Sequence, residues 1–394
     1  MNPFTITPAD RVSRIHEYYF SRKLREVARL NAAGADIVSL GIGGPDRAPD
    51  RSVVDTLADE ARRHDAHGYQ PYNGHPQLRQ AISRWYRRCY GVNVDALTEV
   101  LPLIGSKEGI LHISLAFLNP GDGVLIPDPG YPTYSSVSHI VGAEVYTYNL
   151  LERNGWMPDF DEIERLPLHR IKLMWINYPN MPTGTPASPE LFRRTIDFGR
   201  RHGIVIVNDN PYSMILNNRP LSIMQTEGAK ETAIELNSLS KSHNMAGWRI
   251  GMAVANPEFI GWILKIKSNI DSGQFGPVMA AAARALDLGS EWYDELNDTY
   301  ARRRMIAGNI MDALGCKWDR SQSGLFLWGR IPDTAPSSEA FADMVLDSAR
   351  VFITPGAVFG LNGERYVRIS LCATEERMRT ALARIEQHFK FPSV

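Results

Sequence analysis

The segment Asn237–Gly251 holds the side chains with the most evident chemistry. Lys241 stands there among small hydroxyl residues and glycines, directly after an apolar run. A lysine that is partly buried has a lowered pKa and can form a Schiff base with a carbonyl compound. Ser238, Ser240 and Arg249 could bind a dianionic phosphate, since hydroxyl groups and a guanidinium suit its oxygens. An exposed lysine in a polar loop is an equally good interpretation of this segment alone.

Two more charged residues lie in apolar surroundings. Asp209 ends the run that begins at Ile204, with Tyr212 three residues further on, and ligands bind at the carboxyl ends of parallel strands. A buried carboxylate needs a cation, which a protonated pyridine nitrogen or an internal basic residue would provide. Arg368 alternates with the apolar Val367 and Ile369, so it calls for a bidentate anion. That anion is either a substrate carboxylate or a structural acid.

Two loops add weaker signals. Gly105-Ser106-Lys107 precedes a helix that runs to Leu118, and the free N–H groups at a helix start suit an anion. Asp128-Pro129-Gly130-Tyr131 follows a short apolar run and offers the flat face of Tyr131. A capped turn and a core tyrosine are the simpler explanations when each loop is taken alone.

Several other chemistries lose support. The chain has no GxxxxGK, HExxH, CxxC or GxSxG motif, and the glycines of Leu40–Gly44 do not make GxGxxG. Ser238–Lys241 matches the S-x-x-K of serine acyl-enzymes, and Tyr178–Asn180 matches Y-x-N. However, the K-T-G element is missing and the two matches come in the wrong order. We therefore expect neither nucleotide hydrolysis nor a metal, and give serine chemistry little weight.

The composition is that of a globular protein. The 394 residues include 43 basic and 44 acidic side chains, giving a net charge of −1, and 44% are hydrophobic. This balance argues against a nucleic-acid or membrane partner. Three scattered cysteines and an N-terminus without an apolar signal region predict a cytoplasmic protein. The length predicts two domains.

The order of apolar segments predicts an α/β fold. Short buried strands alternate with amphipathic segments such as Pro189–His202, which indicates a mostly parallel sheet covered on both faces. After about residue 285 a long helix, Trp292–Leu314, and short strands indicate a second α+β lobe, which a helix over residues 14–33 joins. The strands are expected at Val124–Ile126, Leu173–Ile176, Ile204–Val207, Ala233–Leu236, Met252–Ala255, Leu325–Gly329 and Tyr366–Leu371.

Taken together, the motifs resemble the class I/II aminotransferases, which are pyridoxal 5′-phosphate (PLP) enzymes of fold type I. The wording of G-S-K-E-G, D-P-G-Y-P and N-I-D-S-G is most similar to the subgroup with LL-diaminopimelate and related bacterial aminotransferases. The resemblance implies a large PLP-binding domain, 46–284, with a sheet of the seven-stranded type, and a small domain from 1–45 and 285–394. The motifs run in family order over nearly the whole chain: Leu40–Gly43, Tyr69…Gly74, Gly105–Lys107, Asp128–Tyr131, Asn177…Gly184, Asp209…Tyr212, Ser238…Lys241…Arg249 and Arg368.

The resemblance also implies residue roles. Lys241 would form the Schiff base with PLP, Asp209 would keep the pyridine nitrogen protonated, and Tyr212 would bond the phenolic oxygen O3′. Tyr131 would stack on the ring. The phosphate would be held by Gly105, Ser106, Lys107, Ser238, Ser240 and Arg249, with Asn177 also at the cofactor, and with Tyr69 of a neighbouring subunit. Arg368 would clamp the substrate α-carboxylate, with Gly43, Asn180 and Tyr18 at the substrate.

The implied reaction is ping-pong transamination in a homodimer with shared sites. An α-amino acid gives its amino group to the cofactor, Lys241 moves the α-proton to the cofactor carbon C4′, and a 2-oxo acid, commonly 2-oxoglutarate, takes the group away. A PLP-dependent β-lyase or another α-carbanion reaction is the alternative, and a PLP-binding sensor is a third. The distal pocket is not readable beyond the candidates Tyr18, Tyr19, Tyr72 and Gln274, and no second arginine can be assigned to a distal carboxylate.

One position departs from the family pattern. The usual asparagine of N-P-T-G, whose amide donates to O3′, is Met181 here, and a thioether cannot donate a hydrogen bond. We hypothesise a raised pKa of the bound imine, or a replacement donor from Asn180 or water; simple packing of Met181 is the alternative. The family also implies cis bonds at Asp128-Pro129 and Met181-Pro182.

Overall fold

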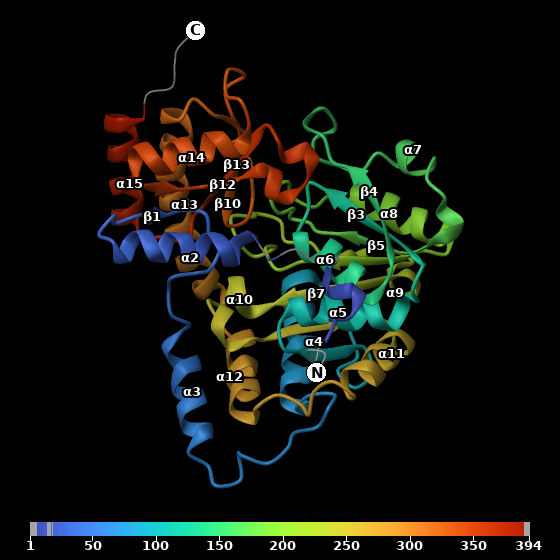
Figure 1. Cartoon of the computed structure of the whole chain (residues 1–394). Coiled ribbons are helices and arrows are strands. Elements are labelled where there is room, and N and C mark those ends of the chain that lie inside the picture. Colours follow the sequence, from blue (N-terminus) through green and yellow to red (C-terminus); the bar gives the residue numbers. More distant parts are fainter. Residues whose placement is uncertain (1–5, 14–16, 18, 390–394) are drawn as a thin grey trace, which may run out of the picture.

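The computed structural model describes residues 6–13, 17 and 19–389 (Figure 1). Tyr18 and part of the predicted helix over 14–33 lie outside the described residues. The described part of that helix is α2 (Tyr19–Ala32), with a left-handed glycine two residues after its end, at Gly34. None of the described helices combines the length and the apolar character needed to cross a lipid bilayer.

A large sheet forms the centre of the molecule. Within the described residues it has seven strands in the order β2-β8-β7-β6-β5-β3-β4. All pairs are parallel except those of β8, which runs antiparallel to both neighbours. The strands are β2 (Val100–Leu103), β3 (Gly123–Asp128), β4 (Glu144–Asn149), β5 (Ile171–Ile176), β6 (Val205–Asp209), β7 (Ala233–Ser238) and β8 (Gly251–Val254). The predicted mostly parallel, seven-stranded sheet is therefore confirmed.

Both faces of this sheet are buried, which explains the continuous apolar runs in the sequence. Met174 and Ile176 of β5 pack in one cluster, whereas Leu173 and Trp175 pack in the cluster on the opposite face. The first face is covered by α4 (Pro76–Tyr90), α8 (Pro189–His202) and α12 (Gly276–Leu286). The second is covered by α5 (Ser106–Phe117), α6 (Pro132–Val141) and α11 (Pro257–Lys267).

A smaller α+β unit lies beside the large sheet (Figure 1). Its antiparallel sheet has the order β12-β13-β10-β9, and its helices bury their apolar faces against these strands. The strands are β9 (Lys317–Trp318), β10 (Phe326–Arg330), β12 (Thr354–Pro355) and β13 (Tyr366–Ser370). The helices are α13 (Ser290–Ala313), α14 (Ser338–Ala349) and α15 (Glu375–His388).

The N-terminal segment joins this smaller unit. β1 (Val38–Ser39) pairs in parallel with β11 (Val351–Phe352), more than 300 residues away in the chain. α2 runs beneath the strands of the smaller unit in Figure 1 and packs with Phe352 and Leu346. α3 (Arg51–Ala61) instead packs on α12 of the large unit. The exact domain limits, 46–284 against 1–45 with 285–394, stay a prediction.

Candidate active site

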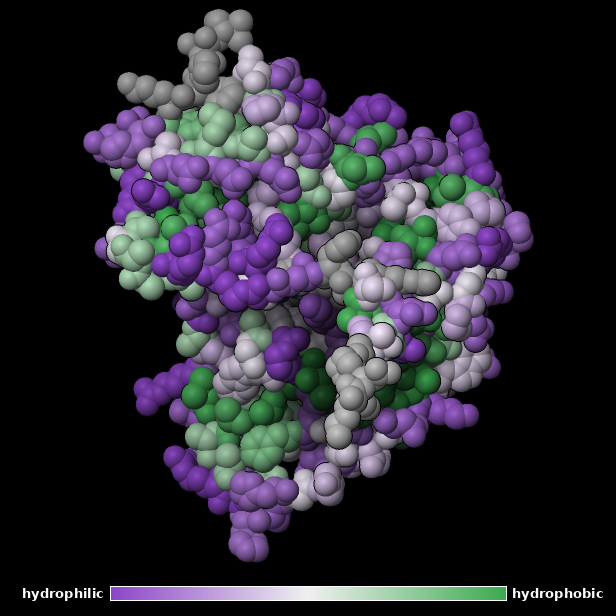
Figure 2. Space-filling model, viewed as in Figure 1, coloured by the Kyte–Doolittle hydropathy of each residue, from purple (hydrophilic) through white to green (hydrophobic). Residues whose placement is uncertain are grey.

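Most of the predicted site residues meet in one cavity of about 390 Å³ at the junction of the two units. It lies on the face shown in Figure 2, which is hollowed near its centre between α2 and α10 (Leu239–Ser242). Twelve of the predicted residues line it: Gly43, Ser106, Lys107, Tyr131, Asn177, Asp209, Tyr212, Ser238, Ser240, Lys241, Arg249 and Arg368. They come from strands, helix starts and loops that are up to 325 residues apart in the chain.

Lys241 lies at the centre of the cavity wall. It sits in the single turn α10 that follows β7, and the Ser238 hydroxyl caps this turn by accepting from the Ser240 N–H at 3.1 Å. The Lys241 ammonium donates to the Gly43 carbonyl oxygen at 2.5 Å. Burial lowers the pKa of Lys241, and Arg368 and Arg249 lower it further. A lowered pKa favours the neutral amine, which is the nucleophilic form of a lysine.

Asp209 lies at the carboxyl end of β6 and lines the cavity. Burial raises its pKa to about 7, against a hydrogen bond from Tyr134 that lowers it. Its Oδ2 accepts from the Tyr134 hydroxyl at 3.0 Å, while its Oδ1 has no hydrogen-bond partner among the described residues. A buried carboxylate with one oxygen directed to no donor is a place for a cationic or N–H-bearing ligand.

Tyr134 is a residue that the sequence analysis missed. It stands one helical turn after Tyr131 in α6, lines the same cavity, and stacks on Trp175 with ring centroids 5.0 Å apart. The spacing of three residues from Tyr131 was the available signal, because it places both rings on one face of the helix.

Arg368 lies in the middle of β13 and is buried. Its Nη2 donates to the Gly41 carbonyl at 2.8 Å, and its Nη1 lies 3.2 Å from the Met181 sulfur. The guanidinium carbon lies 3.9 Å from the ring centre of Phe326 and 4.6 Å from that of Phe359. The two aromatic rings and the Gly41 carbonyl therefore fix the orientation of the Arg368 guanidinium. One of its nitrogens faces only the weak sulfur acceptor of Met181.

Glycines at two places allow this close packing. A Cβ at Gly43 would collide with the ring of Phe326, and one at Gly105 would collide with the guanidinium of Arg249. Gly105 also has a φ of +83°. Gly105 does not line the cavity. Because it has no Cβ, the guanidinium of Arg249 can lie against the start of α5.

Of the fifteen predicted residues that the structure describes, three do not line the cavity: Gly105, Asn180 and Tyr69. The sixteenth, Tyr18, lies outside the described residues. Asn180 does not line the cavity, in contrast to the prediction: its Oδ1 accepts from Thr183 and its Nδ2 donates to the Asn177 carbonyl, so the turn uses both ends of the amide. Tyr69 is 92% exposed in the single chain.

Met181 lines the cavity, and its place beside O3′ of the cofactor stays a prediction. The side chain of Met181 is buried. Three proline bonds in this part of the molecule are cis: Asp128-Pro129, Tyr178-Pro179 and Met181-Pro182. The two predicted cis bonds are confirmed. The Asn180 amide donates one N–H to its own turn and does not line the cavity, so its role as a replacement donor stays a prediction.

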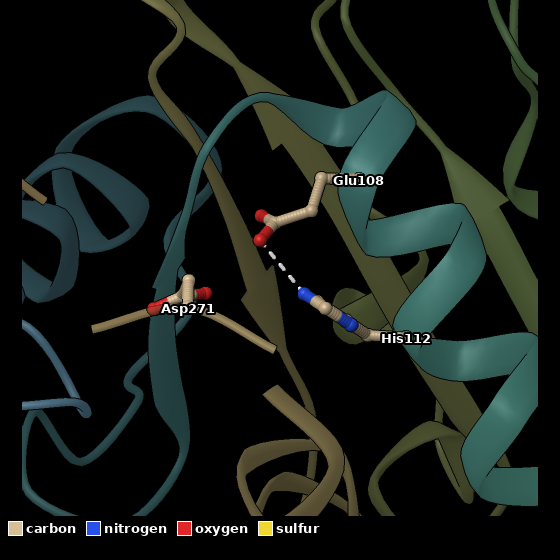
Figure 3. Close-up of side chains that lie close together, drawn as sticks. All are labelled: Glu108, His112 and Asp271. Carbon is tan, nitrogen blue, oxygen red and sulfur yellow. Dashed lines mark hydrogen bonds and ion pairs between the residues drawn. The ribbon is translucent and has the colours of Figure 1, made fainter. Parts of the chain in front are cut away.

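A cluster of three polar residues, Glu108, His112 and Asp271, holds the loop that precedes α5 (Figure 3). Glu108 accepts from the Ile104 N–H at 2.6 Å and lies 2.7 Å from His112 Nε2. Asp271 faces this pair and binds the Lys267 ammonium at 2.8 Å. The ammonium group supplies positive charge to this acidic cluster. The sequence analysis assigned roles only to the first three residues of G-S-K-E-G and missed this anchoring role of Glu108.

Comparison with known proteins decides the family. The model for aminotransferase class I and II matches residues 35–385. The chain belongs to this family. It is 40% identical over 380 residues to an LL-diaminopimelate aminotransferase of Aquifex aeolicus (96% of this chain, 98% of the relative). It is 41% identical over 388 residues to that of Oleidesulfovibrio alaskensis (98% and 99%). The substrate-bound structure of BacF from Bacillus subtilis superposes with a TM-score of 0.92 at 35% identity, covering 98% of each chain.

As a member of the class I and II aminotransferases, the chain is a PLP-dependent enzyme of fold type I. The resemblance inferred from the sequence is confirmed. These relatives are aminotransferases by name, so the β-lyase alternative is not favoured. The site fits the cofactor, because the buried Asp209 has an oxygen directed to no described donor where a protonated pyridine nitrogen can bind.

For the aminotransferase, we expect Tyr134→Phe to weaken cofactor binding about tenfold, because Asp209 loses a hydrogen bond to a charged acceptor. The loss also raises the pKa of Asp209, so the effect grows as the pH falls towards 6. Fluorescence titration of the apoenzyme with PLP measures it. Tyr148→Phe is the matched control, since Tyr148 is buried and donates to the backbone of Trp175. Equal dissociation constants for both variants would contradict the prediction.

Proposed function

We propose that this aminotransferase moves the amino group of an α-amino acid to a 2-oxo acid, with 2-oxoglutarate as the acceptor, by ping-pong half-reactions at Lys241. The observation that carries this proposal is that the buried Lys241 amine, Asp209 with its unpartnered Oδ1, and Arg368 line one cavity. Reduction with borohydride followed by peptide mapping tests it: the cofactor should be found on Lys241. A label on another lysine would refute the proposal.

The residue roles follow from chemistry and position. Lys241 would carry the cofactor, and Asp209 would hold the proton on its ring nitrogen. The phosphate would be held by Ser106, Lys107, Ser238, Ser240 and Arg249, with the N–H groups of the Gly105 turn. Tyr131, Tyr212 and Asn177 would orient the ring. When bound, PLP supplies an aldehyde for the amino group and a ring that withdraws electrons.

The substrate would be held by this chain's own groups. Arg368 would bind the α-carboxylate with its guanidinium, which orients the α-carbon towards Lys241. The amine of Lys241, whose pKa is lowered by burial, would then take the proton from that α-carbon. The Gly43 carbonyl, which accepts from Lys241, would keep the amine aimed at the substrate. LL-diaminopimelate, from the names of the relatives, is one donor to test.

We also propose that the protein is cytoplasmic and forms a homodimer in which each active site contains residues of both subunits. The loop with Tyr69 and Tyr72 packs against the segment with Ile270 and Phe275, and all four side chains are exposed in the single chain. Figure 2 shows apolar surface over the neighbouring α12 on the same face. A second copy that covers this surface would bring Tyr69 to the partner's phosphate site, as the family resemblance implies.

The methionine at position 181 leads to a spectroscopic prediction. We expect Met181→Asn to lower the pKa of the bound chromophore by about one unit, because an amide donor next to O3′ favours the ionised form. A pH titration of the absorbance of the holoenzyme measures this. Met181→Leu, which has a similar size and no donor, should leave the pKa unchanged. An identical titration curve for Met181→Asn would mean that Met181 only packs against its neighbours.

A further inference from the structure

Two loops from different units meet beside the cavity. Residues 128–131 follow β3 in the large unit, and residues 359–362 lie between β12 and β13 of the smaller unit. Tyr131 and Phe359 line the cavity, whereas Asp128 does not. The ring centre of Phe359 lies 4.6 Å from the guanidinium carbon of Arg368. The two loops therefore connect the part of the cavity around Tyr131 with the part around Arg368.

The side chain of Asp128 joins the two loops. Its Oδ2 accepts from the Leu361 N–H at 3.1 Å, and its Oδ1 accepts from the Asn362 N–H at 3.0 Å. Two consecutive backbone groups of the smaller unit thus bind both oxygens of one carboxylate. Hydrogen bonds to a charged acceptor are stronger than those between neutral groups. The carboxylate is therefore a directional link between the units.

Three further hydrogen bonds surround this link. The Asn362 side-chain amide donates to the Asp128 carbonyl at 3.0 Å and to Asn149 Oδ1, at the end of β4, at 2.7 Å. The Gly130 N–H donates to the Phe359 carbonyl at 2.8 Å. These bonds involve the backbones of both loops, so they define the distance between the loops as well as their orientation.

A glycine makes room for the carboxylate. Gly360 has a φ of +137°, and a Cβ at this position would collide with Asp128 Oδ1. The backbone of the smaller unit can approach so closely because the residue has no side chain. Burial raises the pKa of Asp128, and the N–H groups of Asn362 and Leu361 lower it. A buried carboxylate costs free energy unless such donors hold it, so its position depends on the contact between the units.

We infer that Asp128 is a positioning residue, which sets the place of Arg368 relative to the part of the cavity that would hold the cofactor. It acts through Arg368, since it does not itself line the cavity. This inference rests on the proposed function, in which Arg368 binds the α-carboxylate. A guanidinium that is displaced by about 1 Å no longer meets both carboxylate oxygens in good geometry. Loss of the link should therefore weaken substrate binding, while the cofactor, held by groups of the large unit, stays bound.

Two measurements on Asp128→Asn separate these effects. The variant keeps the size of the side chain but places an NH₂ group against one of the two backbone N–H donors. L-glutamate, the amino acid of the proposed acceptor, is mixed with the holoenzyme, and the cofactor absorbance is followed. We expect the half-saturating concentration of L-glutamate to rise about tenfold, whereas the limiting rate and the PLP dissociation constant of the apoenzyme change less than about threefold. An unchanged half-saturating concentration, or an equal loss of PLP affinity, would overturn the inference.

The Arg368→Ala background shows through which residue Asp128 acts. In this background, Asp128→Asn should change kcat/KM less than about twofold, because the group that it positions is gone. A further tenfold loss would mean that Asp128 acts only through the stability of the fold. Glu235→Gln is the matched control, since Glu235 is buried and accepts from the Ile223 N–H and the Ser222 hydroxyl within the large unit. It should lower the free energy of unfolding without raising the half-saturating concentration of L-glutamate.

Hydrogen exchange of the holoenzyme gives a readout that does not depend on turnover. Asp128→Asn should speed the exchange of the backbone amides in residues 359–363 about tenfold or more, and Glu235→Gln should leave it unchanged. Exchange at the rate of the unmodified enzyme would overturn the inference. An unmodified holoenzyme that does not react with L-glutamate would refute the proposed acceptor instead, and the exchange rates would then decide the inference.

Discussion

Lys241→Ala is expected to reduce the rate of amino transfer by about four orders of magnitude or more. The variant loses the covalent attachment point and the group that would carry the α-proton, and general acid–base catalysis alone contributes about 10²–10⁴-fold. Steady-state kinetics with a donor and a 2-oxo acid measures the loss. The variant should also lose the absorbance of the lysine-bound cofactor.

Lys107→Ala is the control for this experiment. Lys107 is the other lysine in the described cavity lining, and burial lowers its pKa as well. Its removal should weaken cofactor affinity while the borohydride-reduced label stays on residue 241. If Lys241→Ala kept substantial activity without an added amine, Lys241 would be neither the attachment point nor the proton carrier.

Replacement of Arg368 by alanine is expected to lower kcat/KM for any α-amino acid by about 10³-fold. A buried guanidinium that binds a carboxylate through two hydrogen bonds contributes about 2–5 kcal/mol, much of it through the penalty for a partner left unpaired. Arg368→Lys keeps the charge and loses the planar fork, so we expect an intermediate loss. The measurement is a kinetic comparison with several donors, since the effect should be independent of the side chain.

Arg79→Lys separates this effect from a loss of stability. Arg79 is also buried, in α4, but it donates to the carbonyls of Ala96 and Leu97 and lies outside the cavity wall. The control should lower the free energy of unfolding and leave kcat/KM within a few-fold. A similar drop in kcat/KM for Arg79→Lys and Arg368→Ala would show that Arg368 acts only through the fold.

The sequence predicted the architecture well because this sheet is buried on both faces. Continuous apolar runs such as that of β5 and helix signals such as Pro189–His202 are local, and the structure has them within two residues of the prediction. The antiparallel direction of β8 could not be derived in this way, because an apolar run has the same composition in either direction. The pairing of β1 with β11 was also hidden, since two-residue strands carry no periodicity.

The site was predictable where charged residues interrupt apolar segments, as Asp209 and Arg368 do. Site residues could not be predicted where their contribution depends on packing against another element or on the conformation of a turn. Phe20 and Phe359 look like ordinary core residues in the sequence, and only the fold brings them to Arg368. The hydrogen bonds that Asn180 makes within its own turn could not be predicted either, because they depend on the folded conformation of that turn.

The parallel pairing of Val38 with Val351 has a consequence for biosynthesis. During translation, the segment that carries Ile42 and Gly43 must wait for more than 300 further residues before its partner strand leaves the ribosome. The Lys241 half of the pocket can be complete by then, whereas the half with α2 and Arg368 assembles only at the end. Contacts of such high sequence separation form slowly, so the nascent enzyme should acquire its cofactor-binding surface earlier than its capacity to select a substrate.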